Sequence, residues 1–247
     1  MTPVGILSGA GWAGGAWLVD TLKDTSLAKT PLDATRIARA DVLTQLGASV
    51  VERATDGLEA CRAERVATIG GSVLASLRTN ERYERRRLRT GRAPPRDFPY
   101  TAPNAWMGEI AAALGARGPN LCLVGSSDVG LVGVATAIRM IASDVCDRAV
   151  VVVAESLPED RSLLPESCLG WVDGAAVVVL ERGGKDAIAI VRAGWGEPMP
   201  SDEVLPSSVD ALVRLMLSAR GDVTARVTAP AAVGAACWVD VEPCPGR

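Results

Sequence analysis

Residues 118–131, with the sequence GPNLCLVGSSDVGL, constrain the fold more than any other stretch of this chain. The apolar run at 121–124 predicts a short strand, and a turn of small residues follows it. The segment 129–140 is again apolar and rich in small residues, which is typical of a buried helix. A strand, a tight turn and a helix place the side chain at the tip of the turn beside the first free N–H groups of the helix. This stretch therefore predicts an α/β fold that presents Ser127 where a nucleophile is commonly held.

The chain contains no histidine, and this bears directly on Ser127. A serine hydroxyl is a weak nucleophile until a general base takes its proton, and histidine is the most common base. The other candidate bases are Asp128, Glu109 and Lys185, of which Asp128 is the immediate neighbour and poorly placed to point at Ser127. Two hypotheses follow. Ser127 is the nucleophile of an acyltransferase or thioesterase, or it is a small residue that fits a tight turn.

The composition argues against several functional classes. The net charge of -3 gives no global attraction to nucleic acid. The apolar stretches are shorter than the roughly 20 residues that a membrane span needs, and the N-terminus lacks the basic and apolar segments of a signal peptide. The six cysteines form no C-x-x-C pair, which predicts reduced thiols in a cytoplasmic protein. Without histidine or paired cysteines, we expect no transition-metal site.

Apolar patterns along the rest of the chain predict further strands at 4–8, 65–71, 148–155, 175–180 and 188–193. Helical spacing predicts helices at 35–64, with a break near Gly57, and at 105–114 and 209–219. We expect 148–155 to be buried on both faces, and the runs at 175–180 and 188–193 to form an antiparallel hairpin. The tail, 220–247, is expected to add one or two strands.

The stretch 9–14 (GAGWAG) matches the G-x-G-x-x-G dinucleotide pattern directly after a strand. That pattern needs a second strand ending in Asp or Glu about 20 residues later. Residues 20–40 instead have the character of a polar loop followed by a helix. We therefore interpret 9–14 as a glycine-rich turn that closes the first strand.

A basic run at 81–96 holds seven arginines against two glutamates. One interpretation is a solvated surface loop. Another is a docking patch for an acidic partner or a phosphate-bearing carrier arm, with Arg85, Arg86, Arg87 and Arg89 as the contact residues. Binding of nucleic acid is disfavoured because no aromatic ladder accompanies the arginines and the whole chain is acidic.

Several short motifs, in one order, resemble the β-ketoacyl synthase family of condensing enzymes. Residues 98–104 (FPYTAPN), 108–111 (GEIA) and Gly118-Pro119 are similar to the segment before the active site of that family. Counting on from these residues, the nucleophilic cysteine of the family falls at Ser127, and its Gly-Leu pair falls at Gly130-Leu131.

Two later segments extend the resemblance to about residues 1–195. Residues 148–155 are similar to the D-x-A-L-x-G-G-x-E strand of the family, and 170–181 to its G-F-x-x-G-E-G-A-x-x-x-V-L-E block. The resemblance implies half of a thiolase-like fold, with a mixed sheet of about five strands covered by helices on both faces. It implies a ketosynthase-like domain over 1–197, and a short extension, 198–247, packed on the same domain.

The departures from the family pattern are as informative as the matches. Condensing enzymes use a cysteine nucleophile and two histidines, whereas this chain has Ser127 and no histidine. It resembles the short ketosynthase-like proteins of bacterial polyene and fatty-acid-like pathways, which are of the chain-length-factor type. This implies a non-catalytic subunit without a cofactor. Its partners would be a full-length ketosynthase, joined across the strand 120–124, and an acyl carrier protein.

Trp106, Met107 and Met140 are candidates for a pocket that limits the length of the acyl chain. The alternative interpretation is that all three are ordinary core residues.

Overall fold

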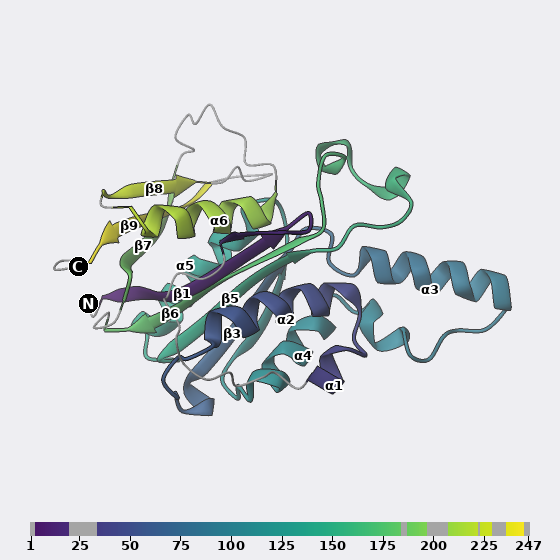
Figure 1. Cartoon of the computed structure of the whole chain (residues 1–247), viewed down its shortest axis with the longest axis horizontal. Helices are drawn as coiled ribbons and strands as arrows, with labels where there is room; N and C mark the ends of the chain where they lie inside the picture. The colour runs from purple at the N-terminus through teal and green to yellow at the C-terminus, as the bar shows by residue number, and fades with distance from the viewer. Residues whose placement is uncertain are drawn as a thin grey trace.

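The computed structural model describes residues 3–19, 34–183, 187–196, 207–221, 223–228 and 236–244. In these ranges the chain forms one mixed sheet with helices on both faces (Figure 1). The strands are β1 Val4–Ala13, β2 Ala16–Val19, β3 Val66–Ser72, β4 Asn120–Val124, β5 Arg148–Glu155, β6 Gly174–Arg182, β7 Ala189–Gly196, β8 Ala225–Thr228 and β9 Ala236–Pro243. The α-helices are α1 Ala34–Ile37, α2 Val42–Thr55, α3 Leu77–Thr90, α4 Ala105–Leu114, α5 Val129–Ala142 and α6 Ser208–Ala219. Short 3₁₀ turns lie at Ala63–Arg65, Phe98–Thr101, Arg161–Leu163 and Glu166–Cys168.

The strand order is β4-β3-β5-β6-β1-β7-β9-β8, with β2 paired to β1. Among the strands that the structure describes, only β3 makes parallel pairs, with β4 and β5, and the other pairs are antiparallel. The sheet thus has nine strands among the described residues, and the expectation of about five was wrong. In the expected C-terminal extension, α6 packs on the sheet, and β8 and β9 are two of its strands. The expected domain boundary at residue 197 lies outside the described residues.

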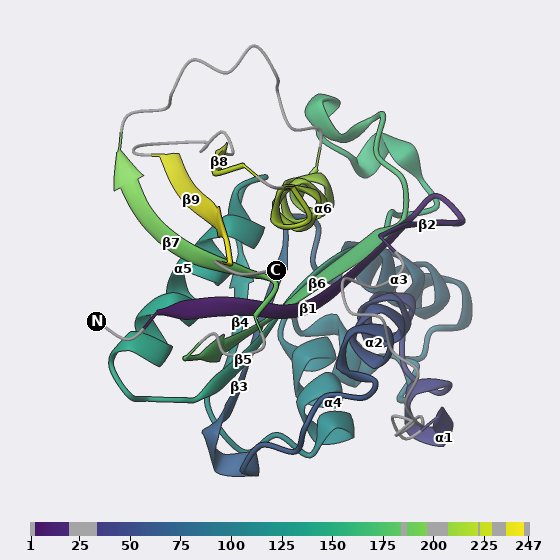
Figure 2. The same ribbon diagram turned by 60° about the vertical axis from the view of Figure 1, so that its left-hand side comes forward.

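Two hydrophobic layers sandwich the sheet (Figure 2). α5 and α6 cover one face, and α2 and α4 cover the other (Figures 1 and 2). Every residue of β5 is buried, with Val151 and Val153 in the first layer and Val150 and Val152 in the second. This two-sided burial confirms the expectation from the apolar run at 148–155 and explains why that run lacks alternation.

The glycine-rich stretch is not the turn that we expected. β1 continues through it to Ala13, and the turn to β2 is made by Gly14 and Gly15, which both have positive φ. A Cβ on Gly11 would lie 2.9 Å from Val213 of α6, so this glycine lets α6 approach the sheet. The stretch is therefore strand and not a strand-to-helix turn, and the dinucleotide pattern lacks its structural context.

Three other sequence expectations are corrected. β6 and β7 do not form a hairpin, because β1 lies between them and pairs with both. The helix expected over 35–64 is two helices, because Asp41 caps a new helix at Val42 and accepts the N–H of Thr44. Most of the basic run is helical, as the greater part of α3, which extends away from the sheet (Figure 1).

Candidate functional site

Ser127 lies in the turn between β4 and α5, as the strand–turn–helix pattern predicts. The turn is held from both sides: the N–H of Gly125 donates to the carbonyl of Ser72 (3.4 Å), and the N–H of Val129 donates to that of Ser126 (2.9 Å). Ser127 is half-buried, while the next residue, Asp128, is buried. The backbone therefore presents Ser127 at the N-terminus of a buried helix.

The two candidate bases in the described part of the chain, Asp128 and Glu109, do not engage Ser127. The carboxylate of Asp128 accepts the hydroxyl of Ser126 instead. Glu109, in α4, pairs with Arg36 and accepts the Tyr100 hydroxyl at 3.5 Å. Lys185 lies outside the described residues. Within the described part of the chain, no hydrogen bond joins Ser127 to an acid or a base, so the turn has the shape of a nucleophile elbow without its proton acceptor.

Sequence reasoning missed Glu155, a fully buried carboxylate at the end of β5. Its Oε1 accepts the N–H of Val73 (2.7 Å) and the hydroxyl of Ser208 (2.6 Å). Its Oε2 accepts the N–H of Leu74 (3.0 Å) and the hydroxyl of Ser72 (3.1 Å). Burial raises the pKa of Glu155, against the lowering effect of these four donors.

Glu155 thereby joins three elements that surround the turn. It ties the end of β3 and the loop before α3 to the first residue of α6, and Ser72 also accepts the N–H of Gly125 through its carbonyl. The available sequence signal was a Glu after the apolar interior of the strand, at the final Glu of the family motif matched to 148–155, because a buried carboxylate needs several donors to be tolerated. Those donors come from distant segments, which sequence spacing does not bring together.

The three residues proposed for a chain-length pocket do not meet in this chain. Trp106 and Met107 belong to α4 and are fully buried in the hydrophobic layer between α2, α4 and the sheet. Met140, in α5, packs against the layer on the opposite face of the sheet. A Cβ on Gly70 of β3 would lie 2.2 Å from Met107, so Met107 fills the space above that glycine. A role for these residues in limiting chain length stays a prediction.

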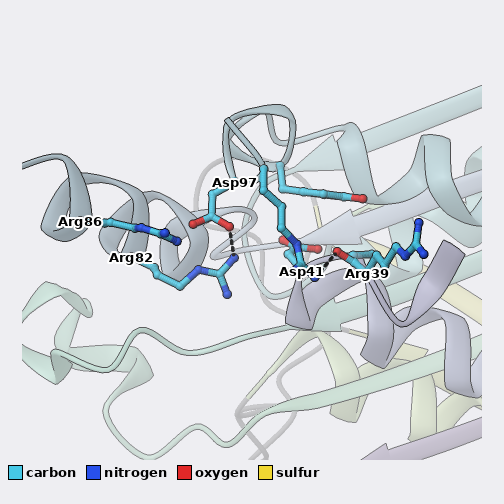
Figure 3. Close-up of a pocket in the computed structure, with 8 residues that line it drawn as sticks. Arg39, Asp41, Arg82, Arg86 and Asp97 are labelled. Atoms are coloured by element: carbon cyan, nitrogen blue, oxygen red, sulfur yellow. Dashed lines mark hydrogen bonds and ion pairs between the residues drawn. The ribbon is translucent and has the colours of Figure 1, made fainter. Parts of the chain in front are cut away.

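The four arginines proposed for docking all lie on α3 and are exposed. Arg85 pairs with Glu81 and with Glu159 (2.6 Å), and Arg87 pairs with Glu84 (2.7 Å). Arg86 instead lines a pocket beside Arg82 (Figure 3), and Arg89 lies one turn further along the helix. The four therefore do not form one uniform patch.

β4 is an edge of the sheet, because it pairs only with β3 among the described residues. The strand carries no charged side chain, and Val124 is 55% exposed. Partly buried apolar side chains of α5, among them Val132, Ile138 and Met140, pack against the same hydrophobic layer as Leu121 and Leu123 of β4. A strand without charged side chains and with one side unpaired is a ready template for another strand.

None of the helices in the described ranges has the length and apolar character that a membrane crossing requires. In the part of the chain that the structure describes, none of the six cysteines forms a disulfide.

A mixed sheet between two helical layers, with a serine turn at the end of an edge strand, places the molecule among thiolase-like condensing-enzyme folds. The chain belongs to the β-ketoacyl synthase family. Residues 21–164, more than half of its length, match the family described as "Beta-ketoacyl synthase, N-terminal domain". A search of curated proteins found no match.

Solved structures share the fold at low sequence identity. A chain of "The ishigamide ketosynthase/chain length factor" matches with a TM-score of 0.71 and 13% identity, over 98% of this chain and 99% of that one. A chain from the complex of ketosynthase ApeO with its chain length factor ApeC, from Xenorhabdus doucetiae, matches with a TM-score of 0.66 and 16% identity, over 98% and 100%. A β-ketoacyl synthase from Burkholderia phymatum matches with a TM-score of 0.57 and 15% identity, over 89% of this chain and 71% of that one.

Proposed function

We propose that this chain is a non-catalytic, chain-length-factor-type subunit. It would pair with a full-length ketosynthase during the elongation of a polyketide, polyene or fatty-acid-like chain on an acyl carrier protein. The observation that carries the proposal is the Ser127 turn. This member of the family keeps the strand, turn and helix, but it has a serine in place of the nucleophilic cysteine. Among the described residues, no acid or base is hydrogen-bonded to that serine. Removing a general base commonly costs several orders of magnitude in rate.

The edge strand β4 supports pairing with a second subunit. Its outer side offers backbone N–H and C=O groups, and its exposed side chains are uncharged. A ketosynthase of the same fold has a corresponding strand, and two such strands can continue one sheet through both subunits. The free cysteines fit a reducing compartment, so we place the complex in the cytoplasm.

The test is a pull-down from native lysate with tagged chain, read by mass spectrometry and by the mass of the purified complex. We expect a full-length, cysteine-bearing ketosynthase at a 1:1 ratio. Val124→Asp, which puts a charge on the β4 edge, should abolish its recovery. Val223→Asp is the matched control, because Val223 is also an exposed valine (76%) but lies away from β4. A stable monomer or homodimer without ketosynthase contradicts the proposal.

A second candidate function rests on the half-buried Ser127 at a helix N-terminus, where backbone N–H groups can stabilise an oxyanion. In this case Ser127 would carry an acyl group as a transferase or thioesterase. Incubation with an acyl thioester followed by intact-mass measurement would then show one acyl adduct, which Ser127→Ala removes and Ser126→Ala retains. The subunit proposal expects no adduct in any of the three proteins.

Carrier docking on α3 is compatible with the subunit proposal. The exposed cations Arg85, Arg86, Arg87 and Arg89 would contact an acidic carrier protein. The pairs of Arg85 with Glu159 and of Arg87 with Glu84 are exposed surface pairs of low strength and can be exchanged for contacts with the carrier. Carrier affinity should fall steeply with salt, whereas the strand-paired ketosynthase contact should not. Equal salt dependence of the two contacts contradicts this assignment.

A further inference from the structure

A small pocket lies between α3 and the junction of α1 with α2, and it includes no residue of the Ser127 turn (Figure 3). Its volume is about 280 Å³, close to the lower end, roughly 300 Å³, of the range for ligand pockets. Its charged lining consists of four arginines and two aspartates: Arg39, Arg82, Arg86, Arg96, Asp41 and Asp97. Because the side chain of Arg39 points away from the others (Figure 3), the remaining three arginines and two aspartates give the pocket a formal excess of one positive charge.

Both aspartates already have partners. Asp41 caps α2: its Oδ1 accepts the N–H of Thr44 (3.0 Å), and its Oδ2 accepts the hydroxyl of Thr79 (2.8 Å). Asp97 accepts a hydrogen bond from Arg82 at 3.0 Å. Neither carboxylate is hydrogen-bonded to Arg86 or Arg96.

The arginines, by contrast, have donors to spare. Arg82 and Arg86 are four residues apart on α3, so both extend from one side of the helix toward Asp97 (Figure 3). Arg96 reaches in from the loop after α3 and donates to the carbonyl of Arg39 at 3.2 Å. Among the described residues, the guanidinium of Arg86 forms no ion pair and no hydrogen bond. The Arg39 side chain points away from the others in Figure 3.

The two aspartates offset only part of the charge of Arg82, Arg86 and Arg96, and the remaining positive charge favours the binding of a further anion between these side chains. Guanidinium groups bind phosphoryl oxygens through two parallel N–H donors, and they do so better than a compact ammonium does. The volume suits one compact group and not a large organic molecule. We propose that this pocket binds the phosphoryl group, or a similar doubly charged oxyanion, of a small ligand, held by Arg82, Arg86 and Arg96.

The probe for the test is inorganic phosphate, titrated into the purified full chain by calorimetry at low ionic strength. We expect one site per chain, and binding about 10–100-fold weaker in Arg86→Gln and in Arg96→Gln, because each removes charge-assisted hydrogen bonds. Arg89→Gln is the matched control: Arg89 is an exposed arginine of the same helix outside the pocket. It should keep the affinity within about twofold. Acetate, with a single charge, should bind at least ten times more weakly than phosphate.

The shift in melting temperature on adding phosphate is a second readout, which separates a loss of binding from poor folding of a variant. Phosphate at a hundredfold excess over its dissociation constant should raise the melting temperature of the unmodified chain by about 5–10 °C, and that of Arg86→Gln much less. Glycerol 3-phosphate distinguishes the source of the group: binding equal to phosphate indicates a phosphate ester, and exclusion indicates the free inorganic ion. The proposal is overturned if the chain does not bind phosphate. It is also overturned if Arg89→Gln weakens phosphate binding as much as Arg86→Gln does, because phosphate would then be attracted by the charge of the whole helix and not by this pocket.

Discussion

The substitution Glu155→Gln tests whether the buried carboxylate holds the elements around the Ser127 turn together. Glutamine has nearly the same shape, but its amide nitrogen cannot accept a hydrogen bond. Each carboxylate oxygen of Glu155 accepts one backbone N–H, from Val73 at Oε1 and from Leu74 at Oε2. Either orientation of the glutamine amide therefore leaves one of these N–H groups facing another donor. The serine hydroxyls can rotate to accept from the amide, so their contribution is largely kept.

The expected loss of stability follows from the one backbone N–H that Glu155→Gln leaves without an acceptor. A buried N–H without an acceptor costs about 1–3 kcal/mol. This holds for either protonation state of Glu155, since a protonated carboxyl can still accept on both oxygens. For a chain of this size, about 2–4 °C in melting temperature corresponds to 1 kcal/mol, so we expect a fall of about 2–12 °C.

The assay is thermal unfolding followed by circular dichroism, repeated in urea. The control is Glu166→Gln, which removes the same charge from an exposed glutamate and should leave the melting temperature unchanged. A change below about 0.5 kcal/mol in Glu155→Gln would refute the reasoning, because the surroundings would then tolerate the loss of an acceptor.

Three further predictions concern packing and pH. Gly70→Ala should destabilise the fold by about 1–3 kcal/mol in urea unfolding, because the new Cβ would lie 2.2 Å from Met107; an unchanged midpoint would contradict this. Gly108→Ala should instead stabilise it by about 0.5–1 kcal/mol, because Gly108 is an exposed residue within α4 with open space around its Cβ position; any loss of stability would count against that assignment. The pKa of Asp147 is lowered by its hydrogen bonds from Arg65, so the stability this pair provides is complete above about pH 4 and is lost as the pH falls further. Asp147→Asn should therefore lower the melting temperature more at pH 7 than near pH 3, and a constant difference between these pH values would exclude the pair as its cause.

The sequence predicted best the elements whose pattern is local. The strand at 148–155 and the helix at 105–114 have the predicted bounds, because a continuous apolar run and a helical period each determine one structure. The Ser127 turn was predicted for the same reason, since its strand, small residues and helix are contiguous in the chain.

The errors arose where distant partners decide the structure. Gly9 and Gly11 suggested a turn, but neighbouring strands and the approach of α6 hold them in β1. The arginine-rich segment lacks an apolar face, yet α3 forms with glutamate pairs along it and contacts from the 159–160 loop. The four donors to Glu155 and the lining of the arginine pocket come from separate segments, so no spacing rule could identify either one.

The two edges of the sheet differ in how well they are protected against aggregation. β8 is only four residues long and carries Arg226, which pairs with Asp240 of β9 and lies over the ring of Trp238. Charge and short length are common ways to discourage stray strand pairing. β4 has neither a charge nor a described neighbour on its outer side. Without a strand bound to it, this edge would be open to other copies of the chain, and we therefore expect the isolated chain to aggregate through β4.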